Sequence, residues 1–282
     1  MMRSVLPRLL AVAVLNSGAV SAWSMSSGTP ITIENGYPVV EVFINSRGPL
    51  RMVLDTGANA CSLSPKAALS ANVSPEHQKL VATVAGEKMV EAAFVPLQLG
   101  SFEALRSEVL IYDIPAVSRL NRHLDGLLGQ SFLSQRPYLL DYRARRLWFG
   151  AEATAKAQRL SQPLNVRKNY NRVLLPVEIG TAKKFFHLVL DSGTSNMLLE
   201  CNTDCPALIG SRAANLTTNT AQTTVLQGQV RDVRIQDVKL SSLPTVLMET
   251  SNCHDESDGL FPARAFSTIY VDVAHGVVRI AH

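Results

Sequence analysis

Residues 52–58 read Met-Val-Leu-Asp-Thr-Gly-Ala, and residues 188–194 read Leu-Val-Leu-Asp-Ser-Gly-Thr. Each stretch is an apolar run that ends in Asp-(Thr/Ser)-Gly. A single copy of this tripeptide is a weak signal, because Asp, Ser, Thr and Gly are all common in turns. Two copies supply two carboxyl groups, those of Asp55 and Asp191, which together can hold one water and share one proton. The repeated motif therefore indicates a hydrolase that works with paired carboxyl groups.

Further landmarks follow the two motifs in the same order. Residues 125–129 (Asp-Gly-Leu-Leu-Gly) correspond to residues 258–262 (Asp-Gly-Leu-Phe-Pro). The offset between copies is 136 residues at the motifs and 133 residues at these landmarks. Landmarks that keep their order and nearly their spacing predict an internal duplication. We expect a first half at 36–150, a polar linker at 151–170 and a second half at 171–282.

The composition predicts a folded chain built almost entirely of β-strands. Hydrophobic residues make up 46% of the sequence and charged residues 18%, which argues against a disordered chain. Short runs rich in Val, Ile, Leu, Thr and Phe alternate with turns, as is typical of β-proteins. Single helical turns are expected at 64–70 and 118–124. Strands are expected at Val39–Ile44, Leu80–Val84, Phe94–Leu99, Val109–Tyr112, Phe185–Leu190, Val225–Ile235 and Thr245–Met248.

On these motifs, each half resembles a retropepsin-like aspartic protease subunit, over roughly residues 36–282. The resemblance implies an all-β, bilobal aspartic-protease fold, with two similar β-barrel-like lobes and the active site between them. Both halves lie in one chain, as in pepsins, so a monomer is expected. The chain departs from the family pattern at Pro262, where the first half has Gly129. It also lacks the flap signature of pepsins, because no Tyr comes shortly before Gly86, the expected tip of the first flap.

The resemblance assigns the catalytic work to Asp55 and Asp191, one as the ionised base and the other as the neutral acid. Two close carboxyl groups cannot both ionise cheaply, so one stays protonated. Ala58 follows the first Gly and Thr194 follows the second. Because a hydroxyl at Thr194 can donate to the adjacent carboxylate, we expect Asp191 to be the ionised member.

Five neighbouring residues, Thr194 among them, are expected to support the catalytic turns. Glycine at 57 and 193 lets the backbone turn sharply and approach the opposite turn. In the family, hydroxyls such as those of Thr56 and Ser192 bond across to the opposite loop. An Asp-Ser-Gly sequence lacks the Gly-x-Ser-x-Gly elbow, so Ser192 is not expected to be a nucleophile.

The expected ligand is an extended peptide or protein substrate, covered by two hairpin flaps with tips at Gly86 and Gly228. An ordinary surface hairpin is the alternative interpretation of each. The favoured function is an exported aspartic endopeptidase. A non-catalytic peptide- or protein-binding module on the same fold, and an enzyme that needs a partner, remain alternatives. No nucleic-acid binding is expected, because the chain carries a formal net charge of only +4.

The N-terminus is typical of a secretory signal. Arg3 and Arg8 precede or flank a short apolar stretch, and small residues follow at 20–22. We expect residues 1–22 to be a signal peptide and 23–35 a flexible mature N-terminus. A retained membrane anchor is the alternative, although the apolar stretch is too short to cross a bilayer. The protein is therefore expected in the periplasm or outside the cell.

The four cysteines, Cys61, Cys201, Cys205 and Cys253, fit an oxidising compartment. Four cysteines allow three pairings, which sequence cannot distinguish. A local bridge between Cys201 and Cys205 and a free, buried thiol at Cys61 are expected. A metal site is the competing interpretation of these cysteines, but no paired Cys-x-x-Cys is present, so neither a metal nor a cofactor is expected.

Overall fold

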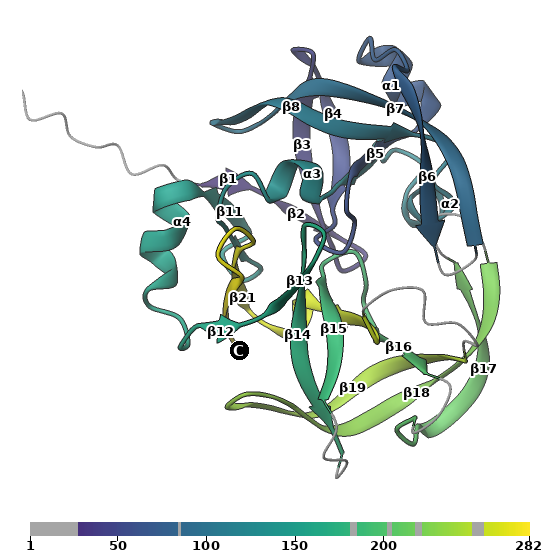
Figure 1. Cartoon of the computed structure of the whole chain (residues 1–282), viewed down its shortest axis with the longest axis vertical. Helices are drawn as coiled ribbons and strands as arrows, with labels where there is room; N and C mark the ends of the chain where they lie inside the picture. The colour runs from purple at the N-terminus through teal and green to yellow at the C-terminus, as the bar shows by residue number, and fades with distance from the viewer. Residues whose placement is uncertain (1–27, 84–85, 181–184, 202–204, 218–221, 250–256) are drawn as a thin grey trace, which may run out of the picture.

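The computed structural model describes residues 28–83, 86–180, 185–201, 205–217, 222–249 and 257–282. Three sheets account for most of this part of the chain, and only short helices accompany them. The predicted all-β aspartic-protease fold is confirmed. Figure 1 shows the first half of the chain above the second, with a smaller sheet beside them.

The first eight-stranded sheet contains the first motif and has the strand order β2-β3-β4-β9-β5-β8-β7-β6. Most neighbours are antiparallel, but β4 and β9 run parallel, as do β5 and β8. The parallel pair β4–β9 brings the motif strand beside the strand of the second landmark. The strands are β2 Thr32–Glu34, β3 Tyr37–Ile44, β4 Arg47–Leu54, β5 Cys61–Leu63, β6 His77–Thr83, β7 Gly86–Leu99, β8 Phe102–Ile111 and β9 Gly126–Leu128.

The second eight-stranded sheet has the order β13-β14-β15-β20-β16-β19-β18-β17, which matches the first sheet strand for strand. The parallel pairs recur as β15–β20 and β16–β19. Each strand therefore has a counterpart in the other sheet, and residues can be compared through their ladder partners. The strands are β13 Arg167–Asn169, β14 Arg172–Ile179, β15 Phe185–Asp191, β16 Met197–Cys201, β17 Ile209–Thr217, β18 Gln222–Ile235, β19 Val238–Glu249 and β20 Gly259–Pro262.

A six-stranded sheet, ordered β1-β11-β10-β21-β22-β12, joins the two halves. Its central pair is β10 of the first half and β21 of the second, with Leu139 opposite Tyr270. The strands are β1 Thr29–Pro30, β10 Tyr138–Asp141, β11 Arg146–Phe149, β12 Leu164–Asn165, β21 Thr268–Asp272 and β22 Val277–Ala281. The helices are α1 Pro65–Ser70, α2 Pro115–Leu120, α3 Gln130–Leu133, α4 Gly150–Ala157 and the 3-10 turn η1 Ala263–Ala265.

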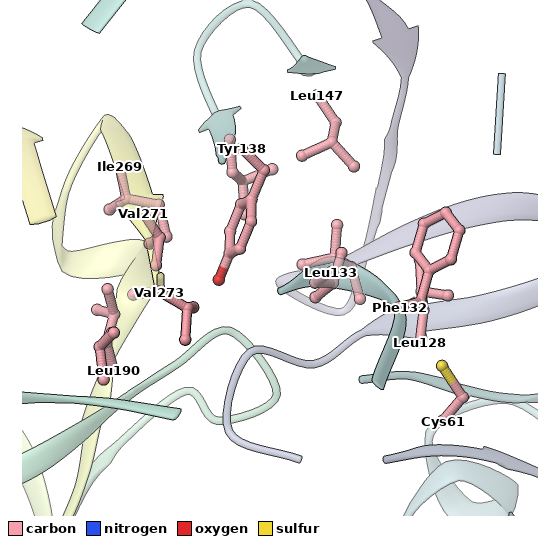
Figure 2. Close-up of a cluster of buried hydrophobic side chains, with 14 of the residues drawn as sticks. Cys61, Leu128, Phe132, Leu133, Tyr138, Leu147, Leu190, Ile269, Val271 and Val273 are labelled. Atoms are coloured by element: carbon pink, nitrogen blue, oxygen red, sulfur yellow. The ribbon is translucent and has the colours of Figure 1, made fainter. Parts of the chain in front are cut away.

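One large hydrophobic core extends through both halves. Figure 2 shows part of this core, in which Leu128 and Phe132 of the first half belong to the same cluster as Leu190 and Val271 of the second. Successive side chains of a strand point to opposite faces. Burial of these apolar faces stabilises the fold by roughly 25 cal/mol per Å², and it fixes the two motif strands in one continuous core.

Two expectations about the connecting segments were wrong in part. Residues 29–34, expected to be flexible, form β1 and β2, which pair with β11 and β3. The 151–170 segment contains most of α4, because its closely spaced alanines favour a helix. Ala153 and Ala157 of α4 pack against Trp148. The predicted helical turn at 64–70 is confirmed as α1, whereas α2 begins three residues before the predicted 118–124.

Residues 1–22, expected to be a signal peptide, lie outside the described part of the chain. Among the described residues, no helix is both long enough and apolar enough to cross a membrane.

Candidate active site

The two motif strands carry Asp55 and Asp191 to equivalent places in the two sheets. The Asp55 N–H donates to the carbonyl of Leu128, 2.9 Å away, and so extends the β4–β9 ladder. Asp191 ends β15, where it lies opposite Pro262 of β20. Both aspartates are buried, and their carboxyl groups are hydrogen-bonded to each other. The fold therefore brings together two acids that are 136 residues apart in sequence.

Four buried hydrogen bonds cross between the two turns through Thr56 and Ser192. The Thr56 hydroxyl donates to the carbonyl of Leu190 at 2.7 Å and accepts from the Ser192 N–H at 3.0 Å. The Ser192 hydroxyl donates to the carbonyl of Leu54 at 2.6 Å and accepts from the Thr56 N–H at 3.0 Å. Each hydroxyl thus satisfies a buried donor and a buried acceptor of the opposite half, which fixes the turns against each other.

The glycines of the motifs lie against the opposite carboxyl groups. A Cβ atom placed on Gly57 would lie 2.5 Å from Cγ of Asp191, and one on Gly193 would lie 2.6 Å from Cγ of Asp55. Both distances are far below van der Waals contact. Only glycine leaves enough space for the two carboxyl groups to approach.

The two carboxyl groups accept different numbers of hydrogen bonds from backbone N–H groups. Oδ1 of Asp55 accepts from the N–H groups of Gly57 and Ala58, both at 3.0 Å. For Asp191 the corresponding bond comes from the Gly193 N–H, at 2.6 Å. A carboxylate that accepts more N–H bonds is more easily ionised. This asymmetry favours Asp55 as the ionised member of the pair.

Burial raises the pKa of both carboxyl groups above the ordinary value of 3.8. The pKa of Asp191 is raised well above that value, first by burial and then by the neighbouring charge of Asp55. The pKa of Asp55 is raised by burial, against the opposing effect of its hydrogen bonds. Two such groups titrate as a pair, and the additional N–H bond to Asp55 favours the shared proton on Asp191.

The expectation that Thr194 makes Asp191 the ionised member was wrong. The Thr194 hydroxyl donates to the carbonyl of Asn196, 2.9 Å away, and turns toward its own loop. The difference between Ala58 and Thr194 therefore acts through the Ala58 N–H and not through the hydroxyl.

Two further residues near the pair were not identified from the sequence. Gln130 donates from Nε2 to the carbonyl of Thr56 at 2.9 Å and to the Tyr138 hydroxyl at 3.2 Å. Its counterpart in the second half is Ala263, so the duplicated pattern gave no signal. Arg172, at the start of β14, lowers the pKa of both aspartates by charge attraction, although burial outweighs this effect.

Gly86 and Gly228, the two glycines predicted to be flap tips, lie in different positions relative to their hairpins. Strands β6 and β7 form a hairpin in which Thr83 pairs with Gly86, and its tip at 84–85 lies outside the described residues. Gly228 is not a hairpin tip, because it lies within β18, opposite Thr245 of β19. The second hairpin is β17–β18, and its connection at 218–221 also lies outside the described residues. Both hairpins extend toward the same side of the molecule in Figure 1.

Cys61 is a free, buried thiol, as predicted. Burial raises its pKa to about 11, and the Gly129 N–H points to its sulfur at 3.4 Å. The predicted bridge between Cys201 and Cys205 stays a prediction, because the side chain of Cys201 lies outside the described part. Within the described part of the chain, no cluster of His, Cys, Asp and Glu has the arrangement of a metal site.

Comparison with known proteins agrees with the geometry. Residues 40–132 match the family model described as aspartyl protease, which supports an aspartyl protease family for the chain. The match covers a third of the sequence and includes Asp55, Thr56 and Gly57. No curated protein matches the chain.

Proposed function

We propose that this protein is an exported aspartic endopeptidase in which Asp55 and Asp191 hold the attacking water. The main support is the pair of buried, hydrogen-bonded carboxyl groups, each facing a glycine of the opposite turn. The four bonds made by Thr56 and Ser192 keep the pair in register. The family match of the first half supports the same activity.

In the proposed reaction, Asp55 is the base and Asp191 the acid. Asp55 removes a proton from the water as the oxygen attacks the peptide carbonyl carbon, and Asp191 donates its proton to the carbonyl oxygen. A tetrahedral diol forms. The C–N bond then breaks as Asp55 passes its proton to the leaving nitrogen and Asp191 takes a proton from a diol hydroxyl. The pair ends with the single proton that it held at the start.

The two lobes are proposed to have arisen by duplication and fusion, which the identical strand orders support. One chain then carries both aspartates, so the protein is proposed to act as a monomer. An extended substrate segment would pair with the β6–β7 and β17–β18 hairpins, as in strand-addition recognition. The signal-like residues 1–22 support action in the periplasm or outside the cell.

Cleavage of a denatured protein from acid to neutral pH tests the proposal. Wild type would be compared with Asp55→Asn, Asp191→Asn and the control Asp237→Asn, which changes an exposed carboxylate far from the turns in sequence. We expect both site variants to lose activity by at least about 10³-fold, a typical scale for removal of a catalytic group, and the control to retain it. Activity that survives either site variant would refute the shared pair. A folded but inactive wild type would favour the non-catalytic binding module.

A further inference from the structure

The peptide group between Thr56 and Gly57 lies between Asp55 and a buried side-chain amide. Its N–H, which belongs to Gly57, donates to Oδ1 of Asp55 at 3.0 Å. Its carbonyl, which belongs to Thr56, accepts from Nε2 of Gln130 at 2.9 Å. A peptide group whose carbonyl accepts a hydrogen bond is more strongly polarised, which strengthens the bond donated by its N–H. Gln130, this peptide group and Asp55 therefore form a continuous chain of hydrogen bonds.

Gln130 holds the same turn at a second point, through its backbone. It is the first residue of α3, and its N–H donates to the carbonyl of Ala58 at 2.9 Å. The preceding residue, Gly129, permits this approach, because a Cβ atom there would lie 2.9 Å from the Ala58 carbonyl oxygen. Thr56 and Ala58 flank Gly57, so Gln130 fixes the backbone on both sides of the N–H that binds Asp55.

The amide of Gln130 is itself held in place. Its Nε2 also donates to the Tyr138 hydroxyl at 3.2 Å, and both side chains are fully buried. Figure 2 shows the Tyr138 ring projecting from its strand into the hydrophobic core. The Thr56 carbonyl can only accept a hydrogen bond, so the nitrogen of the Gln130 amide must face it. Tyr138 thus fixes the amide in the orientation that the chain of bonds requires.

The second half has apolar residues in place of this polar set. The offset of 131 residues between Asp141 and Asp272 relates β10 to β21. With this offset and the ladder partners of the two motif strands, Gln130, Tyr138 and Tyr142 correspond to Ala263, Ile269 and Val273. The Gly193 N–H donates to Asp191, but the side chain of Ala263 has no donor for the peptide group that carries it. The polar set therefore acts on one catalytic turn.

The polar set is costly to keep in a core. Oε1 of Gln130 and the hydroxyl of Tyr142 are both buried, and neither has a hydrogen-bond partner among the described residues. A buried polar atom without a partner lowers stability. Packing alone would be satisfied by an apolar residue, as it is at Ala263, which is also buried. The presence of Gln130 is explained by its bond to the catalytic turn.

The ionisable groups around the pair do not titrate with it. The arginines stay charged, and the pKa values of the tyrosines are raised above their ordinary 10, first by burial. A titration between pH 3 and 8 in this part of the site therefore reports the two aspartates. The groups whose charges act on the pair or on its neighbours are Arg172, Tyr112, Tyr138, Tyr142 and Arg264.

We propose that Gln130 is a positioning residue for the base, Asp55. By donating to the Thr56 carbonyl, it holds the Gly57 N–H on Asp55 and favours the negative charge there, while Tyr138 holds the Gln130 amide. The inference rests on the proposed peptidase function. It adds a second cause for the unequal sharing of the proton, beside the Ala58 N–H.

Gln130→Met tests the proposal, because it removes the amide and keeps an apolar side chain of similar length. We expect kcat for peptide cleavage to fall about 10- to 100-fold, as for a displaced catalytic group. KM should change little, because Gln130 is fully buried. Asp55 should bind its proton more tightly without the polarised N–H, so the acid limb of the kcat/KM profile should move to higher pH. Tyr138→Phe should produce a smaller shift in the same direction.

Two matched controls remove the same groups elsewhere. Gln135→Met removes an exposed amide that donates to the Ser131 carbonyl at 2.7 Å. Tyr270→Phe removes a hydroxyl of the six-stranded sheet that lies 3.1 Å from Oγ1 of Thr154. Both controls should leave the acid limb in place.

The amide resonance of Gly57 gives a readout that needs no turnover. Its proton shift should follow the ionisation of the pair in wild type, and the midpoint should rise in Gln130→Met. A folded Gln130→Met variant with an unmoved midpoint and acid limb would overturn the inference, even if its kcat falls. If that variant does not fold, an unmoved midpoint in Tyr138→Phe would overturn it. Folded wild type that cleaves nothing would refute the peptidase function, while the Gly57 titration would still test the role of Gln130.

Discussion

Removal of the Ser192 hydroxyl should destabilise the protein more than the loss of one ordinary hydrogen bond. Ser192→Ala leaves the Thr56 N–H and the Leu54 carbonyl without their partner, and both groups are buried. An unsatisfied buried group costs about 1–3 kcal/mol, so the loss of two partners should lower the unfolding free energy by about 2–6 kcal/mol. Thr56→Val should in the same way leave the Ser192 N–H and the Leu190 carbonyl without a hydrogen-bond partner.

The two changes should be strongly coupled. Once one hydroxyl is gone, the turns can separate and admit water, so the second removal costs less than it would alone. The two single losses of unfolding free energy, added together, should exceed the loss measured in the double variant by about 1 kcal/mol or more. Peptide cleavage should fall in each single variant, because the carboxyl groups are no longer held in register.

Urea unfolding of the four proteins measures both quantities. Thr245→Val is the matched control, because Thr245 is buried and its hydroxyl bonds the Leu243 carbonyl within a single strand, at 3.0 Å. Its effect should add to that of Ser192→Ala without coupling. Single variants that each cost less than about 0.5 kcal/mol, below the usual cost of a buried orphan group, would refute the bridging role. Simple additivity at the two turns would refute their coupling.

Three further predictions follow from the site. Gly57→Ala should abolish cleavage and displace the Asp191 carboxyl group, whereas a crystal structure with that carboxyl group unmoved would contradict the steric argument. Because burial raises the pKa of Asp191 above its ordinary 3.8, the contribution of this group to the stability of wild type should fall as pH rises above that value. Asp191→Asn should flatten this dependence in urea unfolding at pH 4–8, and an unchanged slope would contradict it. Burial opposes ionisation of Glu34, but Asn121 and Arg51 lower its pKa below 4.5, so its contribution should be present at neutral pH and lost in acid. Glu34→Gln should therefore cost up to about 1 kcal/mol at pH 7 and nothing in acid, and a cost independent of pH would refute the charge effect.

The duplicated landmarks explain why so much of the fold could be predicted. Apolar runs around 39–44 and 185–190 alternate between two faces, and each is bounded by turn residues. Short runs of this kind, bounded by turn residues, are typical of strands. Because the sequence is repeated, the strand of each half is expected to pair with equivalent strands of its own half. The sheet orders could not be predicted, because they depend on ladder partners far apart in the chain.

The errors came where local sequence has two acceptable structures. Residues 29–30 become a strand only through partners such as Leu147, which lies more than 100 residues away, whereas residues 32–34 pair with the neighbouring β3. Gly228 resembled a turn, but its ladder partner Thr245 makes it part of a strand. The Thr194 hydroxyl was expected to donate to the Asp191 carboxylate, but it donates to the carbonyl of Asn196 instead.

The two halves have the same strand order, but the hydrogen bonds around their two aspartates differ. A symmetric pair of aspartates would share the proton equally. Here Ala58 adds an N–H bond to Asp55, and that bond favours a negative charge on Asp55 and the proton on Asp191. The Thr194 hydroxyl, at the matching position of the second half, is bonded instead to the carbonyl of Asn196. Because the two sheets have the same strand order, this asymmetry of the pair comes from the residue that follows each motif glycine and not from the scaffold.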